Sequence, residues 1–173
     1  MADRIQKKPE FFRLFCDSLV VGEGEVAFAQ LAQAVLDGRP PEQVARVLTA
    51  KGRGPAQPLS PVALEDLGPL DLADLPLERY FSPEPVICIQ ASRGCYWGQC
   101  SFCDSYWGVK LDKKSTPRLI AELRRLNELY GVRHFEFIDE CLTPDDMADM
   151  ARAIQASTLR IHWFANARTE KAS

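Results

Sequence analysis

The sequence predicts an α/β protein: a short, mostly helical segment followed by the beginning of a parallel (β/α) array with three strands and two helices. From residue 86 onward, short apolar runs alternate with amphipathic helical patterns. Two Thr-Pro helix starts, at Thr116 and Thr143, are 27 residues apart, and the second and third apolar runs have the same spacing. A β-α repeat of this regularity is typical of parallel strands joined by right-handed crossovers.

The first fifty residues are expected to be mostly helical. A strand is expected over 16–21, and Glu23 then precedes a helix that Gly38 stops. A second, short helix is expected over 42–49, because Pro41 stands at a first-turn position. The buried face of the first helix is expected to carry four apolar side chains: Val26, Leu31, Val35 and Leu36.

Residues 51–85 are expected to form a proline-rich linker. This segment holds seven of the twelve prolines, and proline interrupts regular helices and strands. Apolar residues recur along it, which predicts that it lies along a protein surface: Leu64, Leu67, Leu70, Leu75, Tyr80 and Phe81. The expected organisation is therefore an N-terminal segment over 1–50, this linker, and a C-terminal core over 86–173.

Three strands are expected in the C-terminal core. The first begins at Val86, and the second and third are expected over 132–139 and 159–164. The first strand precedes the second by 46 residues, so about 19 extra residues lie in the first connection, since the repeat itself is 27 residues long.

Two helices are expected between these strands. The first begins at Thr116 and stops at Gly131, and the second begins at Thr143, which is followed by Pro144. The first of them carries a continuous apolar stripe: Leu119, Ile120, Leu123, Leu126 and Leu129.

Composition excludes several classes of protein. The 173 residues are 46% hydrophobic and 26% charged with a net charge of −3, so no basic field predicts a nucleic-acid partner. No apolar stretch approaches the roughly 18 residues of a membrane span. The first ten residues lack the apolar region of a secretory signal, and a cytoplasmic protein is expected.

Three of the six cysteines lie within nine residues, at Cys95, Cys100 and Cys103, in the long connection after the first strand. Loops at the carboxyl ends of parallel strands carry active sites. The spacing Cys-x4-Cys-x2-Cys suits a four-iron cluster in which one iron has no protein ligand. Five aromatic residues are expected to shield this cluster from water: Tyr96, Trp97, Phe102, Tyr106 and Trp107.

Other interpretations of these cysteines stay open. A structural zinc site needs a fourth ligand, for which Asp104, His134 and Cys141 are the candidates. A ferredoxin-like electron carrier is a weaker alternative, because it supplies four cysteines per cluster. The basic run of Lys110, Lys113 and Lys114 is expected to be a solvated face.

Residues 86–170 resemble the start of a radical S-adenosylmethionine (SAM) enzyme core. The signature of this family is three cysteines after the first barrel strand, usually spaced Cys-x3-Cys-x2-Cys, with an aromatic residue before the last. Phe102 fills the aromatic place, and the run from Ser92 to Cys95 matches the common lead-in. The first interval is one residue longer here, as in the cobalamin-binding branch.

The resemblance implies a partial (β/α) barrel and a [4Fe-4S] cluster held by Cys95, Cys100 and Cys103, with SAM on the open iron. A one-electron reductant of the flavodoxin or ferredoxin type would then drive the cleavage of SAM to methionine and a 5′-deoxyadenosyl radical. That radical abstracts hydrogen from a substrate that the sequence does not identify, and no catalytic side chain is assigned.

The resemblance also implies contacts to SAM. Phe102 would lie near the adenine, and Asp139 and Glu140 take the place of the family's motif that meets the amino group. Arg168 is a candidate for the carboxylate or the ribose. For Glu140 a helix-capping role is an equal alternative, and for Arg168 a solvated surface position is the stronger one.

The N-terminal segment resembles the junction that leaves a cobalamin-binding, Rossmann-like domain, on the run from Asp17 to Glu25. No Asp-x-His-x-x-Gly cobalamin-ligand motif is present, so cobalamin is expected only in a full-length relative and is not assigned to this chain. Three functions follow as expectations: a radical SAM enzyme or a piece of one, a truncated iron–sulfur module without turnover, and a structural zinc-binding domain.

Overall fold

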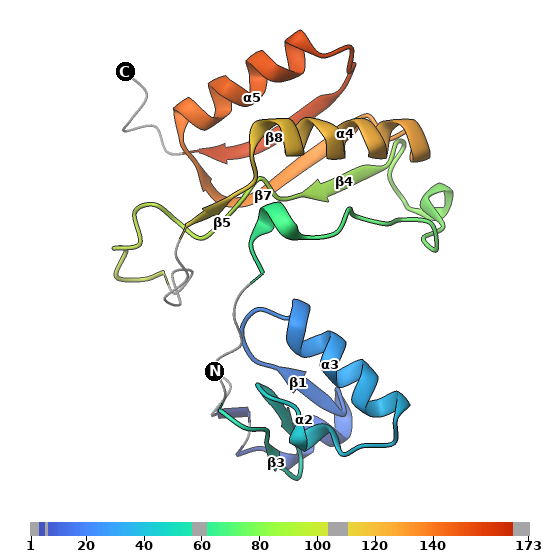
Figure 1. Cartoon of the computed structure of the whole chain (residues 1–173), viewed down its shortest axis with the longest axis vertical. Coiled ribbons are helices and arrows are strands. Elements are labelled where there is room, and N and C mark those ends of the chain that lie inside the picture. Colours follow the sequence, from blue (N-terminus) through green and yellow to red (C-terminus); the bar gives the residue numbers. More distant parts are fainter. Residues whose placement is uncertain (1–3, 6, 57–61, 104–110, 168–173) are drawn as a thin grey trace. The chain divides into compact units, whose positions relative to one another are not determined.

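The computed structural model describes residues 4–5, 7–56, 62–103 and 111–167. The chain divides into two compact units, Met1–Val62 and Ala63–Ser173 (Figure 1). Each unit has a hydrophobic core of its own.

The N-terminal unit contains a small antiparallel sheet with strand order β1-β2-β3. Ala34 of the longer helix packs against Val44 and Val47 in its core. Its elements are α2 (Pro9–Leu14), β1 (Ser18–Val20), α3 (Glu25–Leu36), the 3-10 turn η1 (Pro41–Gln43), β2 (Val47–Thr49) and β3 (Gly52–Arg53).

Two expectations for this unit are wrong. The helix expected over 42–49 is only the turn η1 followed by strand β2, because the positive φ of Arg46 breaks the helix and Val47 pairs with Val20 of β1. The apolar face expected for α3 is wrong at its C-terminal end, since Leu31 packs against the core but Val35 and Leu36 are exposed, and the small residues Ala27 and Ala34 are buried.

The C-terminal unit contains the predicted parallel sheet, with strand order β4-β7-β8. Its α/β character and its three parallel strands are confirmed, whereas a partial barrel stays a prediction. Its elements are the 3-10 turns η2 (Leu64–Asp66) and η3 (Leu77–Arg79), then β4 (Val86–Ile89), β5 (Ser92–Arg93), β6 (Asp112–Lys113), α4 (Thr116–Tyr130), β7 (His134–Leu142), α5 (Pro144–Ala156) and β8 (His162–Ala167).

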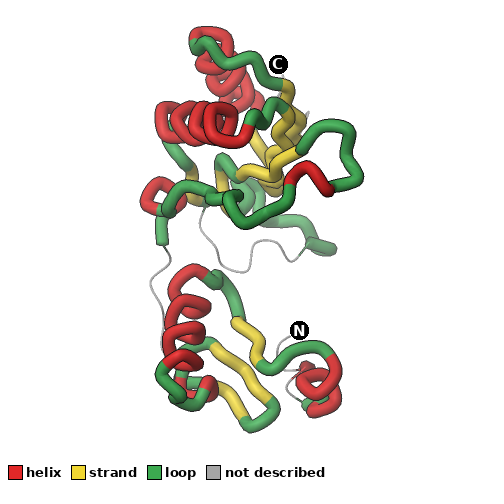
Figure 2. The backbone as a smooth tube through the Cα atoms, turned by 90° about the vertical axis from the view of Figure 1, so that its right-hand side faces the viewer, coloured by secondary structure: helices red, strands yellow, loops and turns green. Residues whose placement is uncertain are grey.

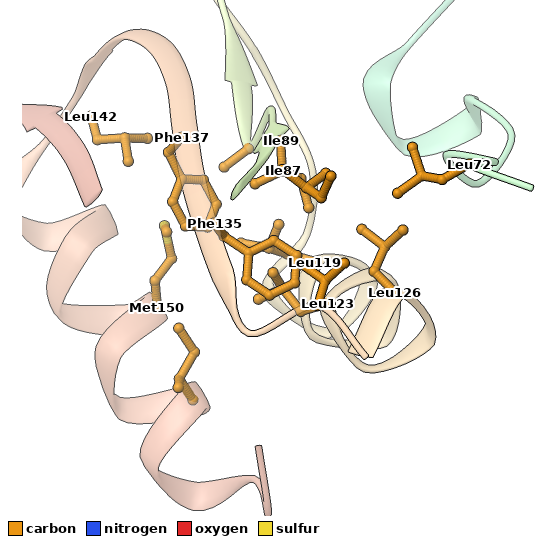
Figure 3. Close-up of a cluster of buried hydrophobic side chains, with 13 residues drawn as sticks. Leu72, Ile87, Ile89, Leu119, Leu123, Leu126, Phe135, Phe137, Leu142 and Met150 are labelled. Carbon is orange, nitrogen blue, oxygen red and sulfur yellow. The ribbon is translucent and has the colours of Figure 1, made fainter. Parts of the chain in front are cut away.

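Helices α4 and α5 lie on one face of this sheet (Figures 1 and 2). Phe135 and Phe137 of β7 point from the sheet toward Leu119 and Leu123 of α4 and Met150 of α5, and all five side chains are buried (Figure 3). Side chains alternate between the two faces of a strand, so every second residue of these strands lies on the other face of the sheet. Three of those residues are exposed apolar side chains: Val86, Ile138 and Phe164.

The helix ends follow the predicted signals. Gly131 ends α4 in the left-handed conformation at φ 67°. The Thr143 side chain accepts a hydrogen bond from the Asp146 amide, and the Asp146 carboxylate accepts one from the Thr143 amide, which completes a capping box at the start of α5.

Part of the proline-rich segment joins the core of the C-terminal unit. Leu64 and Leu72 are buried, and Leu70 is partly buried against the core. Of the other apolar residues expected along a surface, Leu67 is half-buried, and Leu75, Tyr80 and Phe81 are exposed. Among the described residues, no helix combines the length and apolar character that a membrane crossing requires.

Candidate functional site

The three clustered cysteines lie in a loop that begins just after β4 and returns to the start of α4. We call residues 94–111 the cysteine loop; residues 104–110 are outside the described part. Its two ends are joined where β5 pairs with β6 in antiparallel register, Ser92 with Lys113 and Arg93 with Asp112. The Lys114 amide also donates to the Ala91 carbonyl at 2.8 Å. These contacts form a neck at the carboxyl end of β4.

Asp139 of β7 binds the first side of this neck. One carboxylate oxygen accepts hydrogen bonds from the Ser92 amide and from the Ser92 hydroxyl, the latter at 2.6 Å. The other oxygen accepts the Ala91 amide at 3.2 Å. Asp139 is 3% exposed and Ser92 is 2% exposed. Charge-assisted hydrogen bonds away from water are among the stronger polar contacts of a protein.

Glu140 reaches the loop itself. Its Oε2 accepts the Gly94 amide at 3.2 Å, one residue before Cys95. In contrast to Asp139, Glu140 is exposed. Both acidic residues lie inside β7 rather than at its end, because the strand continues to Leu142 through a register shift after Phe137. The expected strand end at residue 139 is therefore wrong by three residues.

The returning side of the neck is held by ion pairs. Lys114 Nζ lies 2.6 Å from Glu122 Oε2 of α4, and both side chains are almost completely buried. Lys113 Nζ lies 2.8 Å from Asp146 of α5, in a more exposed position. Removing one partner of a buried pair costs about 3–5 kcal/mol, whereas an exposed pair contributes about 1 kcal/mol or less. The Lys114 contact therefore dominates, and the expectation of a solvated basic face is wrong for Lys114.

Two carboxylates at this side of the neck have lowered pKa values. Hydrogen bonds from the Ser115 amide and hydroxyl lower the pKa of Glu65. Partial burial by itself would raise the pKa of Asp146, but hydrogen bonds from Lys113 and Thr143 outweigh it, and the pKa is lowered. Both groups are therefore ionised at neutral pH, where Glu65 binds Ser115 and Asp146 binds Lys113.

The predicted metal ligands are all thiols in this loop. Cys95, Cys100 and Cys103 are half-buried, and none of them forms a disulfide. The Cys103 amide donates to the Cys100 carbonyl at 3.2 Å, which makes a tight turn between them. Within the described ranges, no three Cys, His, Asp or Glu side chains are grouped in a way that could hold a metal ion.

The donor set nevertheless fits an iron–sulfur cluster. Thiolates are the usual ligands of such clusters, and this loop offers three of them where a ferredoxin site uses four. Of the zinc alternatives, Cys141 is buried with its thiol 3.7 Å from the Leu142 carbonyl, and Asp104 lies outside the described residues. A cluster with one open iron is consistent with this donor set and stays a prediction.

The predicted aromatic residues of the loop differ in exposure. Phe102 is 91% exposed, so its ring packs against little of the described chain, whereas Trp97 is 43% exposed. Arg168, Tyr106 and Trp107 lie outside the described residues. A cavity of about 50 Å³ lies beneath the neck, lined in part by Ser92, Lys113 and Asp146. A ligand pocket has at least about 300 Å³, so this cavity is too small for a nucleoside.

Sequence reasoning missed Ser92 and Glu122 as parts of this arrangement. Ser92 belongs to the lead-in to Cys95, and the sequence holds no sign that its hydroxyl meets a carboxylate 47 residues away. Glu122 lies on the α4 stripe between Leu119 and Leu123, and an acidic residue among buried leucines is a signal for a buried partner.

Curated proteins similar to this chain are methyl-transferring enzymes by name. Over 88% of the length of this chain, it is 32% identical to the "Uncharacterized methyltransferase PH0819" of Pyrococcus horikoshii. It is 31% identical to the hopanoid C-3 methylase of Methylococcus capsulatus over 65% of its length. It is 27% identical to the cytidylyl-2-hydroxyethylphosphonate methyltransferase of Streptomyces wedmorensis over 57% of its length.

The chain spans 35% of the Pyrococcus relative and 22% of each of the other two. No family model matches the chain. The comparisons therefore link this chain to methyltransferases in general, through the part of those proteins that it covers.

Proposed function

We propose that this chain provides the cofactor-binding part of a SAM-dependent methyltransferase that works by radical chemistry. The observation that supports the proposal is the contact between the exposed carboxylate of Glu140 and the Gly94 amide, one residue before the first of the three loop thiols, at the carboxyl edge of a parallel sheet. The similarity to three enzymes named for methyl transfer supports it. The binding sites for the substrate and for the one-electron reductant would depend on the whole protein and are not assigned to this chain.

In this proposal the thiols and the acidic residues have separate tasks. Cys95, Cys100 and Cys103 would hold a [4Fe-4S] cluster, which when bound supplies the electron that cleaves SAM. Glu140 would accept a hydrogen bond from the SAM ammonium group, since one of its oxygens binds the Gly94 amide and the side chain is exposed. Phe102 would lie near the adenine.

Anaerobic reconstitution with iron and sulfide tests this proposal. We expect a brown protein whose absorption and electron paramagnetic resonance (EPR) spectra change when SAM is added. Cys100→Ala should prevent cluster assembly, because two thiols do not hold the cluster. Cys88→Ala is the matched control, because Cys88 is an exposed thiol on β4 outside the loop.

Three results would contradict parts of the proposal. A colourless protein that binds zinc would make this a structural zinc domain. A cluster that survives in Cys100→Ala would remove the assigned ligand set. A normal cluster whose spectrum ignores SAM would leave an iron–sulfur module without turnover.

A further inference from the structure

The two neighbouring acidic residues of β7 have opposite environments, although both were expected to contact SAM. Asp139 is 3% exposed, and both of its carboxylate oxygens accept hydrogen bonds from Ala91 and Ser92. Glu140 is exposed and uses one oxygen for the Gly94 amide. An ammonium group of a bound ligand needs an acceptor oxygen that it can reach, and Glu140 meets this condition whereas Asp139 does not.

The contacts of Asp139 converge on the point where the cysteine loop begins. Ala91 donates its amide to Asp139 and accepts the Lys114 amide through its carbonyl, so this residue is held from β7 and from the returning end of the loop. Ser92 is bound through both its amide and its hydroxyl and pairs with Lys113. Three hydrogen bonds to one buried carboxylate therefore fix the neck three residues before Cys95.

The backbone of β7 explains how a strand residue reaches this neck. The register between β7 and β8 shifts between Phe137 and Leu142, and Asp139 lies inside that shift. Irregularities of this kind redirect side chains and are frequent next to active sites. Cys141 and Leu142, which follow, are both buried, so the strict alternation of the strand is lost there.

We infer that Asp139, together with Ser92, is a positioning residue that holds the neck of the cysteine loop and does not contact SAM. This inference rests on the proposed function only where it assigns a cluster to the loop. The hydrogen bonds from Ala91 and Ser92 to Asp139, which we call the anchor, are a property of the chain without any cofactor. Glu140 is then the acidic residue that is left for the ligand.

Hydrogen exchange of the cluster-free full chain tests the anchor directly. In Asp139→Asn the amide group replaces one acceptor oxygen with a donor, so it cannot accept from both Ala91 and Ser92. We expect backbone amides in the peptide that covers residues 87–94 to exchange about tenfold faster, and in Ser92→Ala a few-fold faster. Asp145→Asn, an exposed acidic residue in the first turn of α5, is the matched control and should leave this peptide unchanged.

Reconstitution of the same variants separates positioning from ligand contact. Asp139→Asn and Ser92→Ala should bind less iron than the wild type, while the fraction that does form a cluster responds to SAM at the wild-type concentration. Glu140→Gln should show the opposite result, with normal iron content and a SAM response that needs at least about tenfold more SAM, since it loses a charge-assisted hydrogen bond.

Two results would overturn the inference. One is an Asp139→Asn chain with normal exchange in this peptide. The other is an Asp139→Asn chain with normal iron content that needs more SAM. If Asp139→Asn loses its circular dichroism signal, Ser92→Ala decides, because normal exchange and normal iron in that variant also contradict the anchor. If the wild type itself takes up no iron, the proposed function is wrong. The hydrogen-exchange comparison still tests whether Asp139 holds Ala91 and Ser92, because it uses the cluster-free chain.

Discussion

Acidic side chains of the C-terminal unit differ in what surrounds them, and this decides what each of them does. Asp139 is buried against backbone amides, whereas Glu122 is buried against a lysine. Asp146 is half-buried and is shared between Lys113 and the capping box of α5. Because it joins the neck of the cysteine loop to the start of a helix, its ionisation contributes to the stability of both.

The stability of the unit should therefore depend on pH through Asp146. Its pKa in the folded state is below its ordinary value of 3.8, so the ionised carboxylate stabilises the fold above pH 3.8, and this contribution is lost as the pH falls below that value. We expect Asp146→Asn to lower the free energy of unfolding by about 1 kcal/mol at pH 7, through the cap and the exposed ion pair. The difference from wild type should shrink toward pH 2.

Urea unfolding followed by circular dichroism at pH 7, 4 and 2.5 or thereabouts measures this difference. Asp145→Asn is the control, because it removes a charge from the same turn without touching Lys113 or Thr143. A difference that stays constant across this range would show that the charge of Asp146 is not what stabilises the unit.

The helices and strands of the C-terminal unit followed from local signals. Both Thr-Pro starts and the glycine after α4 lie where the sequence predicted, because capping and left-handed glycine act within one turn of the chain. The helix prediction for residues 42–49 was wrong for the opposite reason. A short run with both helical and strand character takes its state from its neighbours, and pairing with β1 made Val47–Thr49 a strand.

The end of α4 offers a test at this scale. Gly131 has a φ of 67°, and a Cβ added there would meet no atom within 4 Å, so Gly131→Ala suffers only from the left-handed backbone. We expect it to lower the free energy of unfolding by about 1 kcal/mol, measured by urea unfolding. Gly68→Ala is the control, because that position is equally open and does not have a positive φ. An equal effect at both positions would argue against the conformational cause.

The whole chain consists of two units with separate cores. Leu123 belongs to the core between α4, α5 and the parallel sheet, and Val47 belongs to the small core of the N-terminal unit. Both side chains are completely buried. The three tryptophans, at residues 97, 107 and 163, are all in the C-terminal unit, so their fluorescence follows that unit alone.

The two cores should respond separately to mutation. Leu123→Ala should lower the free energy of unfolding measured by tryptophan fluorescence by about 3 kcal/mol, because it leaves a cavity in the larger core. Val47→Ala should leave the fluorescence midpoint unchanged and shift only the part of the circular dichroism signal that belongs to the N-terminal unit. A fluorescence midpoint that shifts in Val47→Ala would mean that the two units unfold together.

The sequence by itself determined the periodic elements of the C-terminal unit, its parallel order and the place of the three cysteines after the first strand. These depend on spacing within one element or one repeat, which a linear pattern contains. Only the tertiary structure decided that Asp139 holds Ala91 and Ser92, that Lys114 is buried with Glu122, and that Glu140 stays exposed. The contacts of Asp139 join residues nearly 50 positions apart and therefore depend on strand register, and the register shift in β7 separates the tasks of two adjacent carboxylates that the sequence treats alike.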